Sequence, residues 1–185
     1  LWKQRGWIDD NEVREIKTHH GAFSVTPRKG LRVVSLNTDF WYQYNFYAYI
    51  NSANPDFSGM LRFLTDELLD AEKDGDRVWI VGHVLTGWNG KEALASPTNL
   101  FYQIVSRFAP HTLGAIYFGH THEDQFEVFY FNDNGNDKST DQSTEKAVSI
   151  AYIAPSITPY QNLNPTFRVY SVHPVTYEIM DYDQY

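Results

Sequence analysis

Cysteine is absent from the 185 residues, which excludes a disulfide framework, a thiolate metal site and a cysteine nucleophile. Long apolar runs are absent too, since no stretch approaches the roughly 18 uncharged apolar residues that a membrane-spanning helix requires. Basic residues are few, with 15 Lys and Arg against 23 Asp and Glu. The resulting net charge of −8 argues against a protein that binds a nucleic-acid polymer, because such proteins neutralise phosphates with a basic face.

An initiator methionine and a secretory signal are also missing from the first residues, so we expect an internal start, or a mature or clipped chain. Apolar residues, by contrast, are plentiful, at 42% of the chain with 16% aromatic, and this excludes intrinsic disorder. No internal repeat or linker divides the chain. The length and composition therefore predict one domain over residues 1–185.

Short apolar runs alternate with helical patterns in the first two-thirds of the chain. Residues 31–36 and 78–81 are predicted to be buried strands, and residues 57–73 between them carry one apolar stripe with acidic residues on the other face. A strand, a helix and a strand over this length form a crossover unit, which predicts a partly parallel sheet. A second unit follows, with a helix over 99–108 and a strand over 113–118.

The last third of the chain has a different pattern. Four runs with no helical segment between them are predicted to be antiparallel strands, namely residues 126–131, 147–153, 167–173 and 175–181. The stretch 132–145 is almost wholly polar and is predicted to be an exposed loop. We therefore expect an α/β fold with a mixed sheet whose last strands are antiparallel.

Three of the seven histidines lie where predicted strands end. His83 and His120 each follow an apolar run and a glycine, and His122 comes two residues after His120. Ligands bind at the carboxyl edge of open α/β sheets, and glycine lets the backbone turn tightly or approach a ligand closely. A single histidine at a strand end is more often structural, but the repeated setting favours metal binding, because imidazole is a common ligand of Zn, Fe and Mn. The other four are expected to be structural or exposed (His19, His20, His111 and His173).

The histidines lie in two distinctive blocks, Gly82-His83-Val84-Leu85-Thr86-Gly87 and Phe118-Gly119-His120-Thr121-His122-Glu123-Asp124-Gln125-Phe126. These blocks resemble the calcineurin-like metallophosphoesterases, most closely the acid sphingomyelinases and their fungal phosphodiesterase relatives. Further stretches agree in order, namely Leu36-Asn37, Ala154-Pro155-Ser156, Asn162-Leu163-Asn164-Pro165 and Phe167-Arg168-Val169-Tyr170. The resemblance covers the chain from about residue 31 onward, and departs from the family at Leu85-Thr86, where relatives commonly have prolines.

The resemblance implies both a fold and a chemistry. The fold is a four-layer α/β/β/α sandwich, of which this chain would form the carboxyl-terminal half. Family members hold two metal ions, usually zinc, that clamp a phosphodiester and activate a water for attack on phosphorus. Carried over by motif, His83, His120 and His122 are metal ligands. The family's Asp-x-His, Gly-Asp-x-x-Asp and Gly-Asn-His motifs do not occur in these 185 residues, so we expect a partial zinc site that needs an amino-terminal half for activity.

Three interpretations of this partial motif set stay open. The chain is one piece of a nicked phosphodiesterase, or a truncated, inactive fragment or recruited binding protein, or an enzyme of the same fold with another substrate. That substrate is a sphingomyelin-like lipid in the first reading, and a nucleotide or a polyphosphate in the last. The family also implies a secreted or vacuolar/lysosomal protein. Half of a two-sheet sandwich would in addition expose an apolar sheet face.

Contacts to substrate are predicted from single residues. Tyr160 resembles a family tyrosine near the substrate head group, where a phenol would donate to a phosphate oxygen, although it fits equally well under a proline-rich turn. Glu123 and Asp124 are expected either to hydrogen-bond ligand histidines or to be solvated. The aromatic residues at 41–44 and Trp88 either line a lipid or nucleobase site or fill the core.

Overall fold

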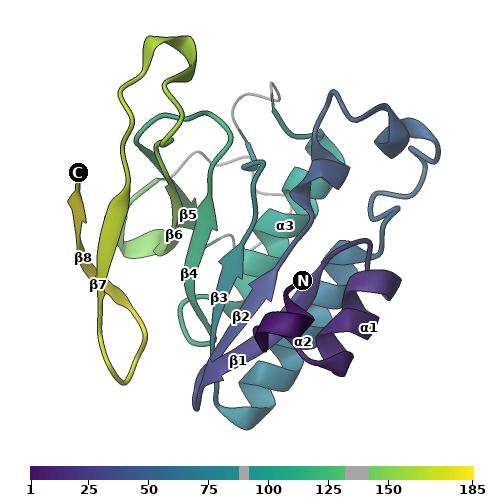
Figure 1. Ribbon diagram of the computed structural model, residues 1–185, viewed down its shortest axis with the longest axis horizontal. Coiled ribbons are helices and arrows are strands. Elements are labelled where there is room, and N and C mark those ends of the chain that lie inside the picture. Colours follow the sequence, from purple (N-terminus) through teal and green to yellow (C-terminus); the bar gives the residue numbers. More distant parts are fainter. Residues whose placement is uncertain (88–91, 132–141) are drawn as a thin grey trace.

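A computed structural model describes residues 1–87, 92–131 and 142–185 (Figure 1). Its centre is a six-stranded mixed sheet with the strand order β1-β2-β3-β4-β6-β5. The strands are β1 (Phe23–Arg28), β2 (Leu31–Ser35), β3 (Arg77–Val81), β4 (Leu113–Phe118), β5 (Gln125–Tyr130) and β6 (Ala147–Ile153). A separate antiparallel pair is formed by β7 (Arg168–Val172) and β8 (Ile179–Gln184). The helices are α1 (Asp10–Thr18), α2 (Met60–Asp74) and α3 (Ala95–Phe108).

Both predicted crossover units are confirmed. Strands β2, β3 and β4 are parallel, and α2 and α3 connect them. Helix α3 starts four residues before the predicted residue 99, with Pro97 in its first turn, where a missing N–H costs nothing. Helix α2 starts at Met60, and the Asp56 carboxylate accepts hydrogen bonds from the backbone N–H groups of Leu61 and Arg62 at 3.0 and 2.9 Å.

One face of the sheet is covered by α2 and α3. Alternate strand residues on this face pair side by side, as Val34 does with Ile80 and Ile116 does with Ala151, and all four are fully buried. The helices add Leu64, Leu68, Phe101 and Val105 to the same core. This aliphatic layer fixes the registers of the parallel strands, because a one-residue slip would turn each apolar side chain to the other face.

The opposite face carries aromatic side chains and contacts the β7–β8 hairpin, which lies at the left in Figure 1. The Tyr170 ring of β7 lies 5.3 Å from the Tyr117 ring and 5.6 Å from the Tyr152 ring. The indole N–H of Trp79 donates to the carbonyl of Tyr177 at 2.9 Å. In the described residues, the second layer opposite the helices is thus this hairpin.

The predicted antiparallel pairing in the last third is confirmed for β5 with β6 and for β7 with β8. Strand β6 also pairs parallel with β4, which was not predicted, so it lies inside the mixed sheet. Strand β8 begins at Ile179, four residues later than the predicted run, because Pro174–Thr176 form a turn. The ring Nδ1 of His173 accepts from the Thr176 backbone N–H at 3.0 Å in this turn, which gives that histidine the structural role expected of it.

The first 30 residues form α1 and the edge strand β1, for which no prediction was made. Asp9 and Glu12 form a reciprocal capping box at the start of α1, and Glu15 accepts from the backbone N–H of Ser24 in β1 at 2.9 Å. The predicted polar loop lies largely outside the described residues, at 132–141. None of the described helices is long and apolar enough to span a membrane.

Candidate functional site

The loop after β3, which carries His83, is anchored by the segment after β2. The buried hydroxyl of Thr38 accepts hydrogen bonds from the backbone N–H groups of His83 and Val84 at 2.9 and 2.7 Å. A Cβ at Gly82 would lie 2.5 Å from the Thr38 side chain, so only glycine fits there. The indole N–H of buried Trp41 donates to the Val84 carbonyl at 2.9 Å. His83 is therefore held by a rigid backbone.

The loop after β4 brings His120 and His122 to the same edge of the sheet. Gly119 donates its backbone N–H to the His83 carbonyl at 3.0 Å, which ties the two loops together. His120 and His122 have φ angles of 77° and 64°, a left-handed conformation that residues with a Cβ rarely adopt and that clusters at functional sites. A Cβ at Gly119 would make only an ordinary contact, so the close-approach argument applies to Gly82 alone.

His83 and His120 face one another. Nδ1 of His120 lies 3.4 Å from Nε2 of His83. The other ring nitrogen of His120, Nε2, lies 2.8 Å from the Glu92 carboxylate. Glu92 is held by its own backbone, whose carbonyl accepts from the N–H of Gln43 at 2.9 Å next to a bridge between Tyr42 and Ala93. The chain thus builds a carboxylate–histidine–histidine array at the carboxyl edge of β3 and β4.

The surroundings of this array favour the neutral form of His83. Burial lowers the pKa of His83, and the neighbouring His120 lowers it further, against an opposing effect of Asp39. The Tyr42 ring contacts His120 edge-on at 4.8 Å, and burial, followed by the charge of Glu92, raises the pKa of its phenol. A neutral imidazole has a free lone pair, which is the form that binds a metal.

His122 and Tyr160 form a second pair. The two rings contact edge-on, with their centroids 5.7 Å apart. Tyr160 is exposed and begins a 3₁₀ turn at Tyr160–Asn162. Nδ1 of His122 is buried and has no hydrogen-bond partner in the described part of the chain. The structure therefore brings His83 and His120 together and sets His122 beside the predicted substrate residue. The roles of all four in binding metal or substrate stay predictions.

The acidic residues after His122 bond side chains other than histidines in the described part of the chain. Glu123 accepts from the Gln125 side chain at 2.6 Å, and Asp124 pairs with Arg168 of β7. Among the described residues, the carboxylate that does bond a histidine side chain is Glu92. No sequence pattern identifies Glu92, because it is a single acidic residue in a loop. The loop is brought to His120 by the bridge between Tyr42 and Ala93.

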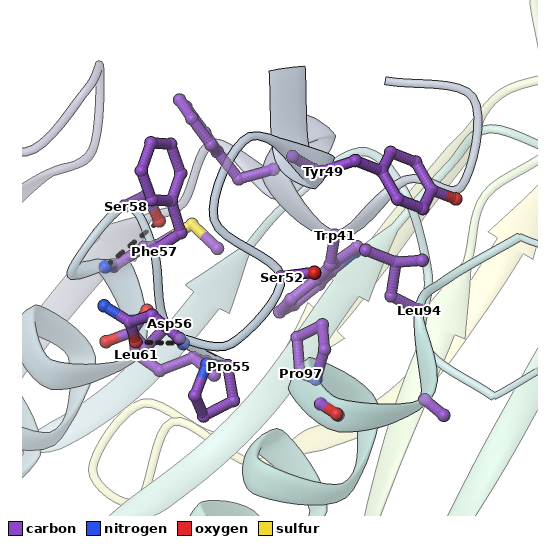
Figure 2. Close-up of a pocket in the computed structure, with 16 residues that line it drawn as sticks. Trp41, Tyr49, Ser52, Pro55, Asp56, Phe57, Ser58, Leu61, Leu94 and Pro97 are labelled. Carbon is purple, nitrogen blue, oxygen red and sulfur yellow. Dashed lines mark hydrogen bonds between the residues drawn. The ribbon is translucent and has the colours of Figure 1, made fainter. Parts of the chain in front are cut away.

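The aromatic residues near the site have divided roles. Trp41 is part of the core, Tyr42 contacts His120, and Tyr44 is exposed; Trp88 lies outside the described residues. A cavity of about 190 Å³ lies between this segment and the start of α3, lined by residues such as Tyr49 and Pro97 (Figure 2). It contains no histidine and is smaller than the roughly 300 Å³ of a typical ligand pocket, so it is not the candidate site.

The donor set fits one part of a metal site. Two facing imidazole nitrogens, one of them on a ring whose other nitrogen bonds a carboxylate, form a common arrangement at zinc centres. Among the described residues, however, no three His, Asp or Glu side chains group closely enough to hold a metal ion. Zinc usually takes four ligands, so a complete site needs further ligands.

Comparisons with known proteins agree with the family resemblance of the sequence. No family model matches the chain. Sphingomyelin phosphodiesterase from Bos taurus is 39% identical over 166 residues, and the human protein is 38% identical over 166 residues; each match covers 90% of this chain and 24% of the relative. Sphingomyelin phosphodiesterase 2 from Caenorhabditis elegans is 33% identical, over 100% of this chain and 28% of its own.

Among solved structures, a dimetal phosphatase from Danio rerio superposes with a TM-score of 0.46 and 11% identity, covering 72% of this chain and 48% of that chain. The identities over nearly all 185 residues come from relatives of the same name in a cow, a human and a worm. The chain is therefore homologous to the sphingomyelin phosphodiesterases and spans about a quarter of the length of these relatives.

Proposed function

We propose that this chain forms the histidine part of a phosphodiesterase site that hydrolyses a sphingomyelin-like lipid. The observation that carries the proposal is the facing of His83 and His120 at 3.4 Å, with Glu92 behind His120. The relatives' shared name, sphingomyelin phosphodiesterase, supports the reaction and the lipid substrate.

In this proposal His83 and His120 bind zinc, His122 adds a further ligand, and Tyr160 lies where it would meet the phosphate or head group. Zinc, when bound, polarises the phosphodiester and lowers the pKa of a bound water towards 7. Glu92 is a positioning residue, because its bond to Nε2 of His120 leaves Nδ1 directed at His83. A secreted or vacuolar/lysosomal location is proposed on the same family resemblance.

The 185 residues alone are expected to have negligible activity. Two metal ions held side by side need a bridging carboxylate, and among the described residues no three His, Asp or Glu side chains group closely enough to hold even one metal ion. An amino-terminal half with the Asp-x-His, Gly-Asp-x-x-Asp and Gly-Asn-His motifs is the proposed partner. The absence of a three-ligand group in the described residues equally favours the alternative of an inactive binding fragment.

The test is turnover of the water-soluble bis(p-nitrophenyl) phosphate by the chain, with and without the amino-terminal half, and with and without a chelator. The mixture is expected to show zinc-dependent turnover that His120→Ala lowers at least about a hundredfold, with little effect on folding. His111→Ala is the matched control and should leave the rate unchanged, because this exposed histidine precedes β4 whereas His120 follows the strand at its other end. Full chelator-sensitive activity of the 185 residues alone would refute the partial site.

The role of Glu92 has its own readout. Glu92→Gln should weaken zinc binding by about 10- to 100-fold in calorimetric titration of the mixture, because the amide no longer fixes the imidazole as a carboxylate does. Glu123→Gln is the control, since Glu123 bonds Gln125 and not a histidine. Equal zinc affinities of the two variants would remove Glu92 from the site.

A further inference from the structure

The segment after β2 exposes a group of large apolar side chains next to the candidate site. We call residues 44–50 the aromatic ridge. Phe46 is 82% exposed, Ile50 67% and Tyr44 65%, while Tyr47 and Tyr49 are each nearly half exposed. Single exposed apolar residues are ordinary on protein surfaces, but a group of five within seven residues marks an interaction surface.

The ridge carries no charge. Residues 40–55, between Asp39 and Asp56, contain no Lys, Arg, Asp or Glu, although the chain as a whole has a net charge of −8. An acidic protein with an uncharged apolar projection is not attracted to an anionic membrane, which recruits basic segments. Tyrosine and phenylalanine are typical of the interface between lipid head groups and acyl chains, where an apolar ring and a polar tip are both satisfied.

Part of the backbone of the ridge is hydrogen-bonded within the segment and its flanks. Within the 3₁₀ turn at Phe46–Tyr49 and its flanks, Asn45 donates to Tyr42, Ala48 to Asn45 and Ile50 to Tyr47 at 2.9–3.2 Å. The Tyr49 hydroxyl donates to the Gln43 carbonyl at 2.7 Å and closes the segment. These bonds lower the cost of entering a poorly hydrated interface, because the groups that make them do not lose water without a partner.

The ridge is also continuous with the histidine pair. The Tyr44 ring contacts the Tyr42 ring at 5.4 Å, and the Tyr42 ring contacts His120 at 4.8 Å. In Figure 1 the ridge projects at the upper right, on the side of the molecule toward which the carboxyl ends of the central strands point. A surface that held the ridge would therefore lie beside the candidate site.

We infer that the aromatic ridge docks on a lipid bilayer whose head groups are zwitterionic, such as phosphatidylcholine or sphingomyelin. The inference deepens the proposed function, on which it rests for the choice of a phosphocholine lipid. Docking would bring the histidine pair to the membrane surface, where the ester bond of such a lipid lies. The bound surface is the membrane as a whole, and the ridge itself takes no part in hydrolysis.

The experiment is flotation of the 185-residue chain with vesicles of phosphatidylcholine, without added metal. The double variant Phe46→Ser/Ile50→Ser is expected to bind at least about tenfold more weakly than the parent chain. The control is Phe126→Ser/Val175→Ser, which removes an exposed phenylalanine and an exposed aliphatic residue far from the ridge and should bind as the parent does. Raising the salt from about 0.1 to 0.5 M should leave binding unchanged, because no ion pair is involved.

Several results would overturn the inference. Equal binding of the two double variants would exclude the ridge, and a preference for anionic vesicles with loss of binding in salt would exclude a zwitterionic surface. Self-association that the ridge variant abolishes, without vesicle binding, would show that the ridge contacts protein. Since binding is measured without metal and on a lipid that need not be hydrolysed, it does not depend on turnover of the soluble phosphodiester, so either proposal can fail alone.

Discussion

The two faces of the six-stranded sheet are covered to different degrees. On the face under α2 and α3, Ile80 and Ile116 are fully buried. On the opposite face, Trp79 and Tyr117 are partly covered by the β7–β8 hairpin, while Val81, Phe126 and Ile150 are 38–68% exposed. The first face, which we call the covered face, is packed into the core by the helices. The second, which we call the open face, contacts the hairpin through a small number of aromatic and polar interactions. The first face therefore stabilises the domain, whereas the second leaves apolar side chains exposed.

The largest expected effect comes from breaking the covered face. Ile80→Ala should lower the free energy of unfolding by about 3–4 kcal/mol, because Ile80 is fully buried between β2, β4 and the helices and its loss leaves a cavity. Ile150→Ala makes the same change on the open face, where the side chain is 40% exposed, and should cost under about 1 kcal/mol. Urea denaturation of the two variants measures the difference, and equal losses would contradict the comparison.

A pH titration tests how well the covered face excludes water. Burial raises the pKa of Glu127, on β5, from its usual 4.5 to about 7. Between these pH values the Glu127 side chain binds fewer protons in the unfolded chain than in the folded one. Its contribution to the free energy of unfolding is therefore complete below pH 4.5 and is lost as the pH rises through 7, by up to about 3 kcal/mol. Glu127→Gln should flatten this slope in denaturation curves between pH 5 and 8, whereas Glu123→Gln should not. A parent chain with no such slope would mean that water reaches Glu127.

The hairpin contact with the open face is the next target. The Arg168 side chain is 1% exposed, pairs with Asp124 and lies 4.7 Å over the Tyr182 ring. Arg168→Ala should destabilise the chain by about 2 kcal/mol, since packing, the ion pair and the ring contact are lost together. Arg168→Lys keeps the charge without the planar group and should recover less than half of this loss in thermal melts. A full recovery would assign the whole effect to charge.

The smallest effect is expected at the start of α2, one of the covering helices. Its N-cap residue is Gly59, which has no capping side chain, and the Asp56 carboxylate bonds the backbone N–H groups of Leu61 and Arg62. Asp56→Ala should cost about 1 kcal/mol, measured by urea denaturation, because these N–H groups lose their acceptor. Asp70→Ala, on the exposed side of the same helix, is the control and should leave the midpoint unchanged.

The covered face was also the more predictable one. The apolar stripe of residues 57–73 and the runs at 31–36, 78–81 and 113–118 have strong periodicity, and each became an element of the predicted type. The first 30 residues carry weaker signals. Helix α1 has no buried residue, and β1 contains Pro27, which is tolerated only at the edge of a sheet.

The candidate site was predictable only in part. The Gly-His strand ends identify His83 and His120, because the end of a strand is a local feature of the sequence. Glu92 was missed, since its approach to His120 depends on a bridge between segments about 50 residues apart. The left-handed backbone of His120 and His122, which directs one ring to His83 and the other to Tyr160, has no sequence signature outside glycine.

The strand order determines when the sheet can be completed during synthesis. Strand β5 is made before β6, yet in the sheet β6 lies between β4 and β5, and β5 is the edge strand that pairs with β6. During synthesis on the ribosome, β5 therefore lacks its strand hydrogen bonds until β6, which ends at residue 153, has emerged. A chain that stopped before residue 147 would not be a trimmed version of the sheet. It would lack an interior strand and would hold two unsatisfied edges, at β4 and at β5, which are ready-made templates for aggregation.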